Sequence, residues 1–153
     1  MQAYSLEIVP RGASRHRTAG RRTYIPAEHR DWVNAAVIQF REQSSGECWT
    51  GLVALALDVY MPRPKRRPPW IQPAAWKLGI AHPTPVKPDV DNLAKIVMDA
   101  MVDAGLLEDD RFVCELHVTR QIHAVGDVPG VLVTVETWTP EAHGWPASSG
   151  IVG

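Results

Sequence analysis

The sequence is poor in cysteine: only Cys48 and Cys114 are present, far apart in the chain. They form no disulfide framework, which is typical of a protein of the reducing cytosol. No run approaches 18 apolar residues, so a membrane-spanning helix is not expected. The first residues lack the charged and apolar regions of a signal peptide, and no glycine-rich phosphate loop is present. We therefore expect a cytoplasmic protein that does not contact a membrane.

The length of 153 residues, with 45% hydrophobic and 22% charged side chains, predicts one globular domain. The last residues are rich in glycine, proline and serine, which is typical of a terminus with few contacts. We expect a single domain over 1–139 and a flexible C-terminal tail over 140–153.

The net charge of −1 hides an uneven distribution. Residues 1–77 contain twelve Lys and Arg against six Asp and Glu, whereas residues 78–153 contain four against eleven. The distribution either indicates a polyanion-binding half beside a cation-binding half, or it reflects solvated surface charge.

Apolar patterning predicts an α+β fold with the element order β-α-β-α-β-β. The segment 52–61 is almost continuously apolar, as in a buried central strand, and 112–120 alternates as in a half-buried strand. Segments 11–24 and 71–88 are predicted to be irregular because they are rich in glycine or proline. We expect two main helices on a mixed sheet of about four strands, with strands at 4–9, 52–61, 112–120 and 131–137 and helices at 26–43 and about 90–104.

Two aspartates, Asp89 and Asp91, stand at the start of the second predicted helix. Either can cap that helix, and Asn92 can cap it or order a ligand. Capping does not explain both acids, nor the pair Asp109 and Asp110 downstream. Because Mg²⁺ prefers carboxylate oxygens, the acids indicate a divalent-cation site, with solvated caps and turn acids as the alternative.

Chain geometry predicts that Asp110 returns to the helix start. A helix from Asp91 to residue 104 rises about 20 Å, and an extended segment 106–110 covers about 17 Å after a reversal at Gly105. Asp110 would then lie beside Asp89 and Asp91, where three carboxylates repel one another unless a cation lies between them.

Lys95 follows Asp91 by about one helical turn. Its ammonium either pairs with Asp99 on the helix surface or stabilises phosphate charge in a transition state.

These residues carry a family resemblance. The run Lys87-Pro88-Asp89-Val90-Asp91-Asn92-Leu93, followed by Lys95 and Asp99 and then by Glu108-Asp109-Asp110, resembles the RusA-type Holliday junction resolvases. The resemblance covers about 87–120, and the preceding layout, including Met61-Pro62-Arg63-Pro64-Lys65, is also similar. It implies a small, dimeric, Mg²⁺-dependent endonuclease of a kind common in prophages, with Mn²⁺ able to replace Mg²⁺. It also implies that Asp89, Asp91 and Asp110 bind the metal, that Lys95 is catalytic, and that Asp109 supports the site.

Two basic loops accompany the acids. Exposed basic loops either improve solubility or contact phosphate, and beside a carboxylate site they indicate a phosphate track. Trp70 and Trp76 either stack on bases at a junction or belong to a core or dimer interface. The residues predicted to bind DNA are Arg15, Arg17, Arg21, Arg22, Arg63, Lys65, Arg66, Arg67 and Lys87.

The resulting hypothesis is an enzyme that resolves four-way DNA junctions by paired phosphodiester hydrolysis, acting at the nucleoid in recombination and repair. Each cut would leave a 5′-phosphate and a 3′-hydroxyl. Two symmetric cuts require two equivalent sites, so we expect a homodimer. Two alternatives remain: a structure-selective nuclease for other branched DNA, and a junction-binding protein that does not cut.

Overall fold

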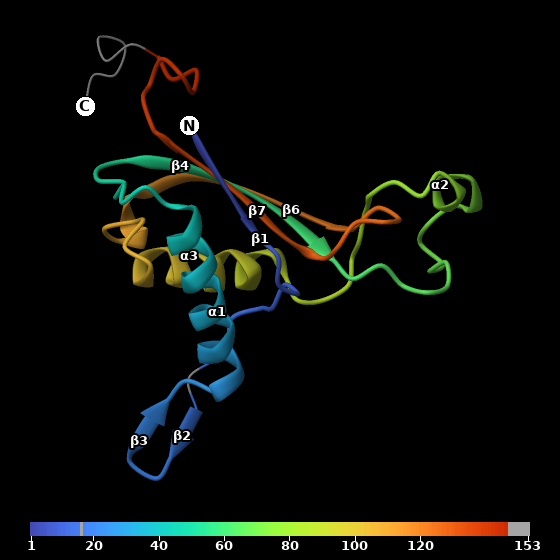
Figure 1. The fold of residues 1–153 in the computed structure, drawn as a ribbon, viewed down its shortest axis with the longest axis horizontal. Coiled ribbons are helices and arrows are strands. Elements are labelled where there is room, and N and C mark those ends of the chain that lie inside the picture. The colour runs from blue at the N-terminus through green and yellow to red at the C-terminus, as the bar shows by residue number, and fades with distance from the viewer. Residues whose placement is uncertain (16, 147–153) are drawn as a thin grey trace.

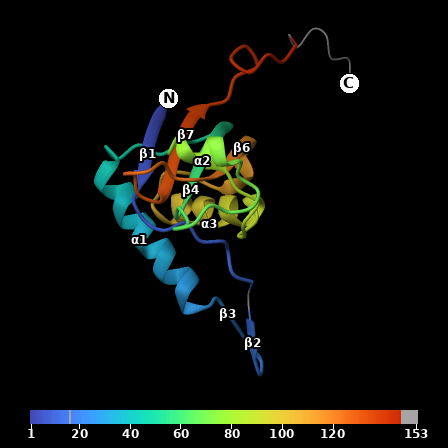
Figure 2. The same ribbon diagram turned by 90° about the vertical axis from the view of Figure 1, so that its right-hand side faces the viewer.

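A five-stranded sheet forms the centre of the structure, a computed structural model that describes residues 1–15 and 17–146 (Figures 1 and 2). β4 runs parallel to β6 and antiparallel to β7, so the sheet is mixed. The predicted α+β fold is confirmed, with one strand more in the sheet than expected. In spatial order the strands are β1 (Gln2–Leu6), β7 (Gly130–Thr137), β4 (Val53–Met61), β6 (Val113–Ile122) and β5 (His82–Pro83).

Two main helices, α1 (Ala27–Gln43) and α3 (Val90–Asp103), pack against each other over the sheet. Every apolar position on the inner side of α3 is buried because the pattern repeats with the helical period. Alternate residues of β4 enter the same core, including Leu57 and Val59, which are fully buried. The predicted helix at 26–43 and the predicted central strand are confirmed. None of the helices in the described part of the chain is long and apolar enough to cross a membrane.

The first strand is shorter than predicted. β1 ends at Leu6, because the Glu7 N–H donates to the Gln39 side chain of α1 (2.7 Å) instead of continuing a sheet ladder. Val9 then accepts a hydrogen bond from the Trp32 indole (2.8 Å), which fixes the exit of the chain over α1.

The segment predicted to be an irregular loop over 11–24 contains a hairpin, formed by β2 (Arg17–Ala19) and β3 (Arg22–Tyr24). Ala19 pairs with Arg22, leaving a two-residue turn in which Gly20 has a φ of 64°. Such turns favour glycine at a positive φ, a signal that the arginine-rich composition concealed. The hairpin extends away from the body of the molecule (Figure 1).

A second projection, here named the α2 arm (residues 62–81), contains the short helix α2 (Pro73–Lys77) (Figure 1). The Arg63 guanidinium donates to the carbonyls of Trp76 (3.4 Å), Ile80 (3.1 Å) and His123 (3.1 Å). It also lies 4.2 Å from the centroid of the Trp76 ring. These contacts give order to a proline-rich segment that was expected to be irregular.

Residues 140–146 contact the sheet through His143. Its ring stacks on Trp138 at 5.9 Å, and its Nδ1 lies 2.7 Å from Glu115 Oε2. The remainder of the predicted tail, 147–153, lies outside the described residues.

Gly130 begins β7 at a point where β1 passes very close. A Cβ at this position would lie 2.3 Å from the Leu6 carbonyl oxygen. We expect Gly130→Ala to destabilise the protein by about 1–3 kcal/mol, because the two strands must separate to admit the methyl group. Thermal unfolding followed by circular dichroism measures the change, and Ser5→Ala, on the exposed side of β1, is the control. Equal melting temperatures for Gly130→Ala and wild type would contradict the expectation.

Candidate active site

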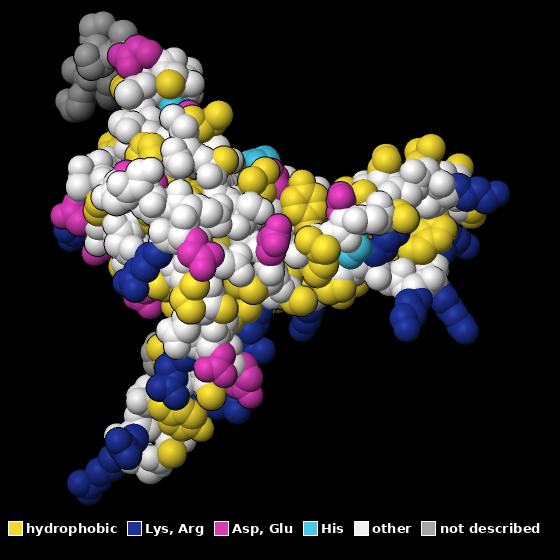
Figure 3. Space-filling model, viewed as in Figure 1, with side chains coloured by type: hydrophobic (Ala, Val, Ile, Leu, Met, Phe, Trp, Pro, Cys, Tyr) yellow, Lys and Arg dark blue, Asp and Glu magenta, His cyan; other side chains and the backbone are white. Residues whose placement is uncertain are grey.

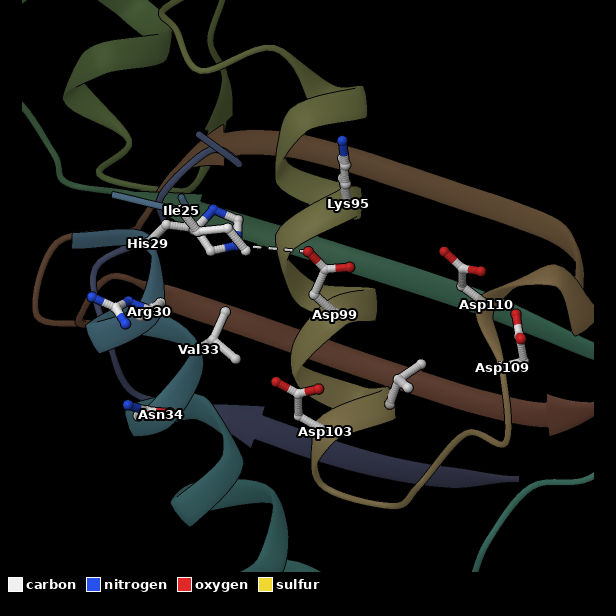
Figure 4. Close-up of a pocket in the computed structure, with 11 residues that line it drawn as sticks. Ile25, His29, Arg30, Val33, Asn34, Lys95, Asp99, Asp103, Asp109 and Asp110 are labelled. Carbon is white, nitrogen blue, oxygen red and sulfur yellow. Dashed lines mark ion pairs between the residues drawn. The ribbon is translucent and has the colours of Figure 1, made fainter. Parts of the chain in front are cut away.

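A cleft of about 620 Å³ opens beside α3 and is lined mainly by polar side chains (Figure 4). Lys95, Asp99 and Asp103 lie along one side of α3, because residues four apart return to the same face of a helix. Asp109 and Asp110 face them from the chain that leads into β6, where Asp110 begins the 3₁₀ turn η1 (Asp110–Phe112).

The reversal after α3 determines where Asp110 lies. Gly105 has a φ of 79°, and the Leu106 N–H donates back to the Met101 carbonyl (2.9 Å). Leu106 and Leu107 are then buried in the core. The chain therefore turns inward before it reaches η1, and it presents Asp110 to the cleft near Asp99.

The predicted convergence of three acids at the start of α3 is not seen. Asp89 occupies the N-cap position without a side-chain capping bond, Asp91 lies in the first turn, and both are exposed. Neither lines the cleft that contains Asp110. Over residues 1–15 and 17–146, no three His, Cys, Asp or Glu side chains are close enough together to hold a metal ion. The spacing argument assumed a fully extended return, whereas burial of Leu106 and Leu107 bends it.

The donor chemistry nevertheless fits a hard divalent cation. Asp89, Asp91 and Asp110 offer exposed carboxylate oxygens at α3 and at the segment packed against it. Mg²⁺ is usually bound through one or two carboxylates, with water and substrate phosphate completing its octahedron. A preformed cluster of three carboxylates is therefore not required when a phosphate group and water complete the coordination.

Asp99 is a carboxyl of the cleft whose pKa is perturbed by its surroundings. Partial burial raises its pKa, while the nearby His29 ring and the Lys95 ammonium act in the opposite direction and the charges of Asp103 and Asp110 raise it further. Asp109 differs, because the Arg111 N–H donates to its carboxylate (2.9 Å) and holds its pKa below the usual range. Asp109 thus shapes the turn that carries Asp110.

His29 of α1 was missed by sequence reasoning. It lines the cleft, yet only 6% of its side chain is exposed, and its Nε2 lies 3.6 Å from Asp99 Oδ2. The available signal was its spacing from Trp32, Val33 and Ala36, which places a polar residue on the buried face of α1.

The start of α3 lies between the root of the hairpin and the end of the α2 arm. On one side, the Ala13 N–H donates to the Asn92 carbonyl (3.0 Å), and a Cβ on Gly12 would overlap Pro88. On the other side, the Arg120 guanidinium donates to the carbonyls of Thr84 (3.0 Å) and Pro88 (2.6 Å). Asn92 therefore contributes through its backbone, and both the hairpin root and the segment that follows the α2 arm are held at the start of α3.

The basic residues divide into free and engaged groups. Figure 3 shows lysine and arginine side chains on both projections. Arg63 donates to three carbonyls of the arm and its base, which gives it a structural role in the arm. Arg67 donates to the Ile71 carbonyl (2.7 Å) while remaining exposed. The other residues predicted to bind DNA are exposed: Arg15, Arg17, Arg21, Arg22, Lys65, Arg66 and Lys87.

Comparison with known proteins identifies the family to which the chain belongs. The family model described as Endodeoxyribonuclease RusA matches residues 6–136. A relative from Aquifex aeolicus (strain VF5), named Crossover junction endodeoxyribonuclease RusA, is 25% identical over 114 residues, which is 74% of each chain. The matched region contains the cleft, both projections and the whole α3 segment, and the chain therefore belongs to the RusA family of endodeoxyribonucleases, which are phosphodiester hydrolases.

Proposed function

We propose that this protein is a Mg²⁺-dependent resolvase of four-way DNA junctions. The observation that carries the proposal is a pair of acids at the start of α3, beside the root of the basic hairpin, on a molecule with a second basic projection and in a chain of the RusA family. A branched duplex offers phosphates on more than one arm, and two separated basic surfaces suit such a substrate better than one flat patch does.

In this proposal the side chains have distinct roles. Asp89, Asp91 and Asp110 would supply carboxylate ligands to the cation, which would activate water and neutralise the charge of the scissile phosphate. Lys95 supplies positive charge beside the reacting phosphate, where charge develops in the transition state. The exposed arginines of the hairpin and the α2 arm bind phosphate and orient the junction. Trp70, which is 40% exposed on the arm, is available to stack on a base.

We further propose that the active form is a homodimer. Resolution requires two cuts at symmetric positions, and a twofold axis supplies two equivalent sites at a fixed separation. The proposed setting is recombination and repair of DNA in the cytoplasm, with a prophage as the proposed source, and with the single domain ending near residue 139.

A cleavage assay tests the proposal directly. The purified protein is incubated in Mg²⁺ with three substrates in separate reactions. These are an immobile four-way junction, a flap and a linear duplex of the same sequence. We expect the four-way junction to be cut fastest, with paired cuts on opposing strands. Equal or faster cutting of the flap would instead establish a general nuclease for branched DNA. Tight junction binding without cutting in Mg²⁺ or Mn²⁺ would establish a binding protein.

Two exposed arginines of the α2 arm, Arg66 and Arg67, give a prediction about salt dependence. Each neutralised phosphate adds about 0.9 to the slope of log affinity against log salt. We expect Arg66→Ala to lower the slope by about one unit, and the pair Arg66→Ala and Arg67→Ala by up to about two. Gel-shift titrations at several salt concentrations measure the slope. Lys77→Ala, at the last residue of α2, tests whether removing any positive charge from the arm lowers the slope equally. An unchanged slope in the Arg66 variants would show that these arginines do not contact phosphate.

A further inference from the structure

His29 connects the hairpin root (residues 12–14) to the cleft. The Ser14 N–H donates to His29 Nδ1 at 2.9 Å, so this nitrogen carries no proton. The ring proton therefore lies on Nε2, which faces Asp99 Oδ2 at 3.6 Å. Burial of the ring, with 6% of the side chain exposed, fixes both contacts in one orientation.

Asp99 occupies a central place in the cleft. Its carboxylate lies between His29 and Asp110, one helical turn from Lys95 (Figure 4). It is also accessible, with 42% of the side chain exposed. A carboxylate that only packed the two helices together would not need this opening toward solvent and toward the acid on η1.

An ionised Asp99 carboxylate beside other acids is unfavourable unless His29 and Lys95 offset the repulsion. Like charges in a partly buried site disfavour ionisation, and the raised pKa of Asp99 shows that both burial and the nearby acids have this effect. Natural structures keep such groups where chemistry uses them more often than where packing alone would suffice.

We propose that Asp99 is a further cleft carboxylate required for the cleavage step, and that His29 is a positioning residue that acts through it. This inference rests on the proposed nuclease function. The Nε2–H of His29, 3.6 Å from Asp99 Oδ2, favours an orientation of the Asp99 carboxylate toward Asp110 and Lys95 by electrostatic attraction, and the hydrogen bond from Ser14 couples the ring to the root of the hairpin.

The test is a double-mutant cycle with His29→Ala, Asp99→Asn and the double variant, measured by single-turnover cleavage of the four-way junction in Mg²⁺. Asp31→Asn, an exposed acid on α1, is the control for loss of one negative charge. Junction affinity by gel shift without metal and the melting temperature are measured for every variant. His29→Gln, which keeps a donor on a side chain of similar reach, tests rescue and replaces His29→Ala if that variant does not fold.

We expect His29→Ala and Asp99→Asn each to slow cleavage by about 10–100-fold, as partners of reacting groups do, with junction affinity unchanged. In the Asp99→Asn background, replacing His29 should cause no further loss, and His29→Gln should recover part of the rate. Independent, multiplying losses, or a loss of affinity in place of rate, would overturn the inference. A wild-type protein that fails to cut the junction would instead overturn the proposed function, so the two failures are distinguishable.

Discussion

Asp91→Asn is expected to slow junction cleavage by about a hundredfold or more and to leave junction binding intact. Asp91 lies in the first turn of α3, exposed, beside the root of the hairpin. An amide of the same shape keeps the helix but loses the charge that a divalent cation requires. We expect a fall of about 10²–10³-fold in the single-turnover rate, comparable to the loss of one preorganised electrostatic group in other active sites.

Binding and cleavage must be measured separately for this variant. Gel shifts without metal should show affinity equal to or above that of wild type, because one negative charge near phosphate has been removed. Asp127→Asn, in the exposed turn between β6 and β7, is the matched control and should cut normally. Cleavage by Asp91→Asn at the wild-type rate, with Mg²⁺ present, would exclude Asp91 from the site.

The fold was predictable wherever a periodic apolar pattern was strong. The apolar stripe of α3 fits only a helix, and the apolar run of β4 was predicted to be a buried strand. The bounds of both elements were predicted within one or two residues. The hairpin was not predicted, because its stability signal is a two-residue turn at Gly20 inside an arginine-rich segment. The α2 arm depends on Arg63 reaching carbonyls distant in sequence, and no local pattern encodes such a contact.

The site was predictable in residue type and only partly in position. Spacing placed Asp89 and Asp91 at the helix start, and they are there. The position of Asp110 depends on how Leu106 and Leu107 enter the core, which is a tertiary effect that chain length alone cannot give. His29 was missed because its partner Asp99 comes from another helix.

A mixed dimer is expected to nick a four-way junction once and to leave it unresolved. If each subunit cuts one strand, a dimer of one wild-type subunit and one Asp91→Asn subunit has a single competent site. Such dimers can be isolated by placing a different affinity tag on each subunit and purifying over both columns. The junction should then accumulate a single nick, which a denaturing gel detects. A native gel should show no linear duplex products, because the junction is not resolved.

The same prediction requires a stable dimer in solution. A specific homodimer interface of ordinary size buries about 1,200–2,000 Å² and is more apolar at its centre than the rest of the surface. The described surface offers several exposed apolar side chains on the α2 arm and on the turn after β6, among them Leu78, Ile80 and Val125. Sedimentation of the wild-type protein at cleavage concentrations should therefore show a dimer. Two results would contradict this prediction: a monomer that makes both cuts, or mixed dimers that resolve junctions as fast as wild type. In either case a single active site must cut both strands in turn, and each subunit would act alone.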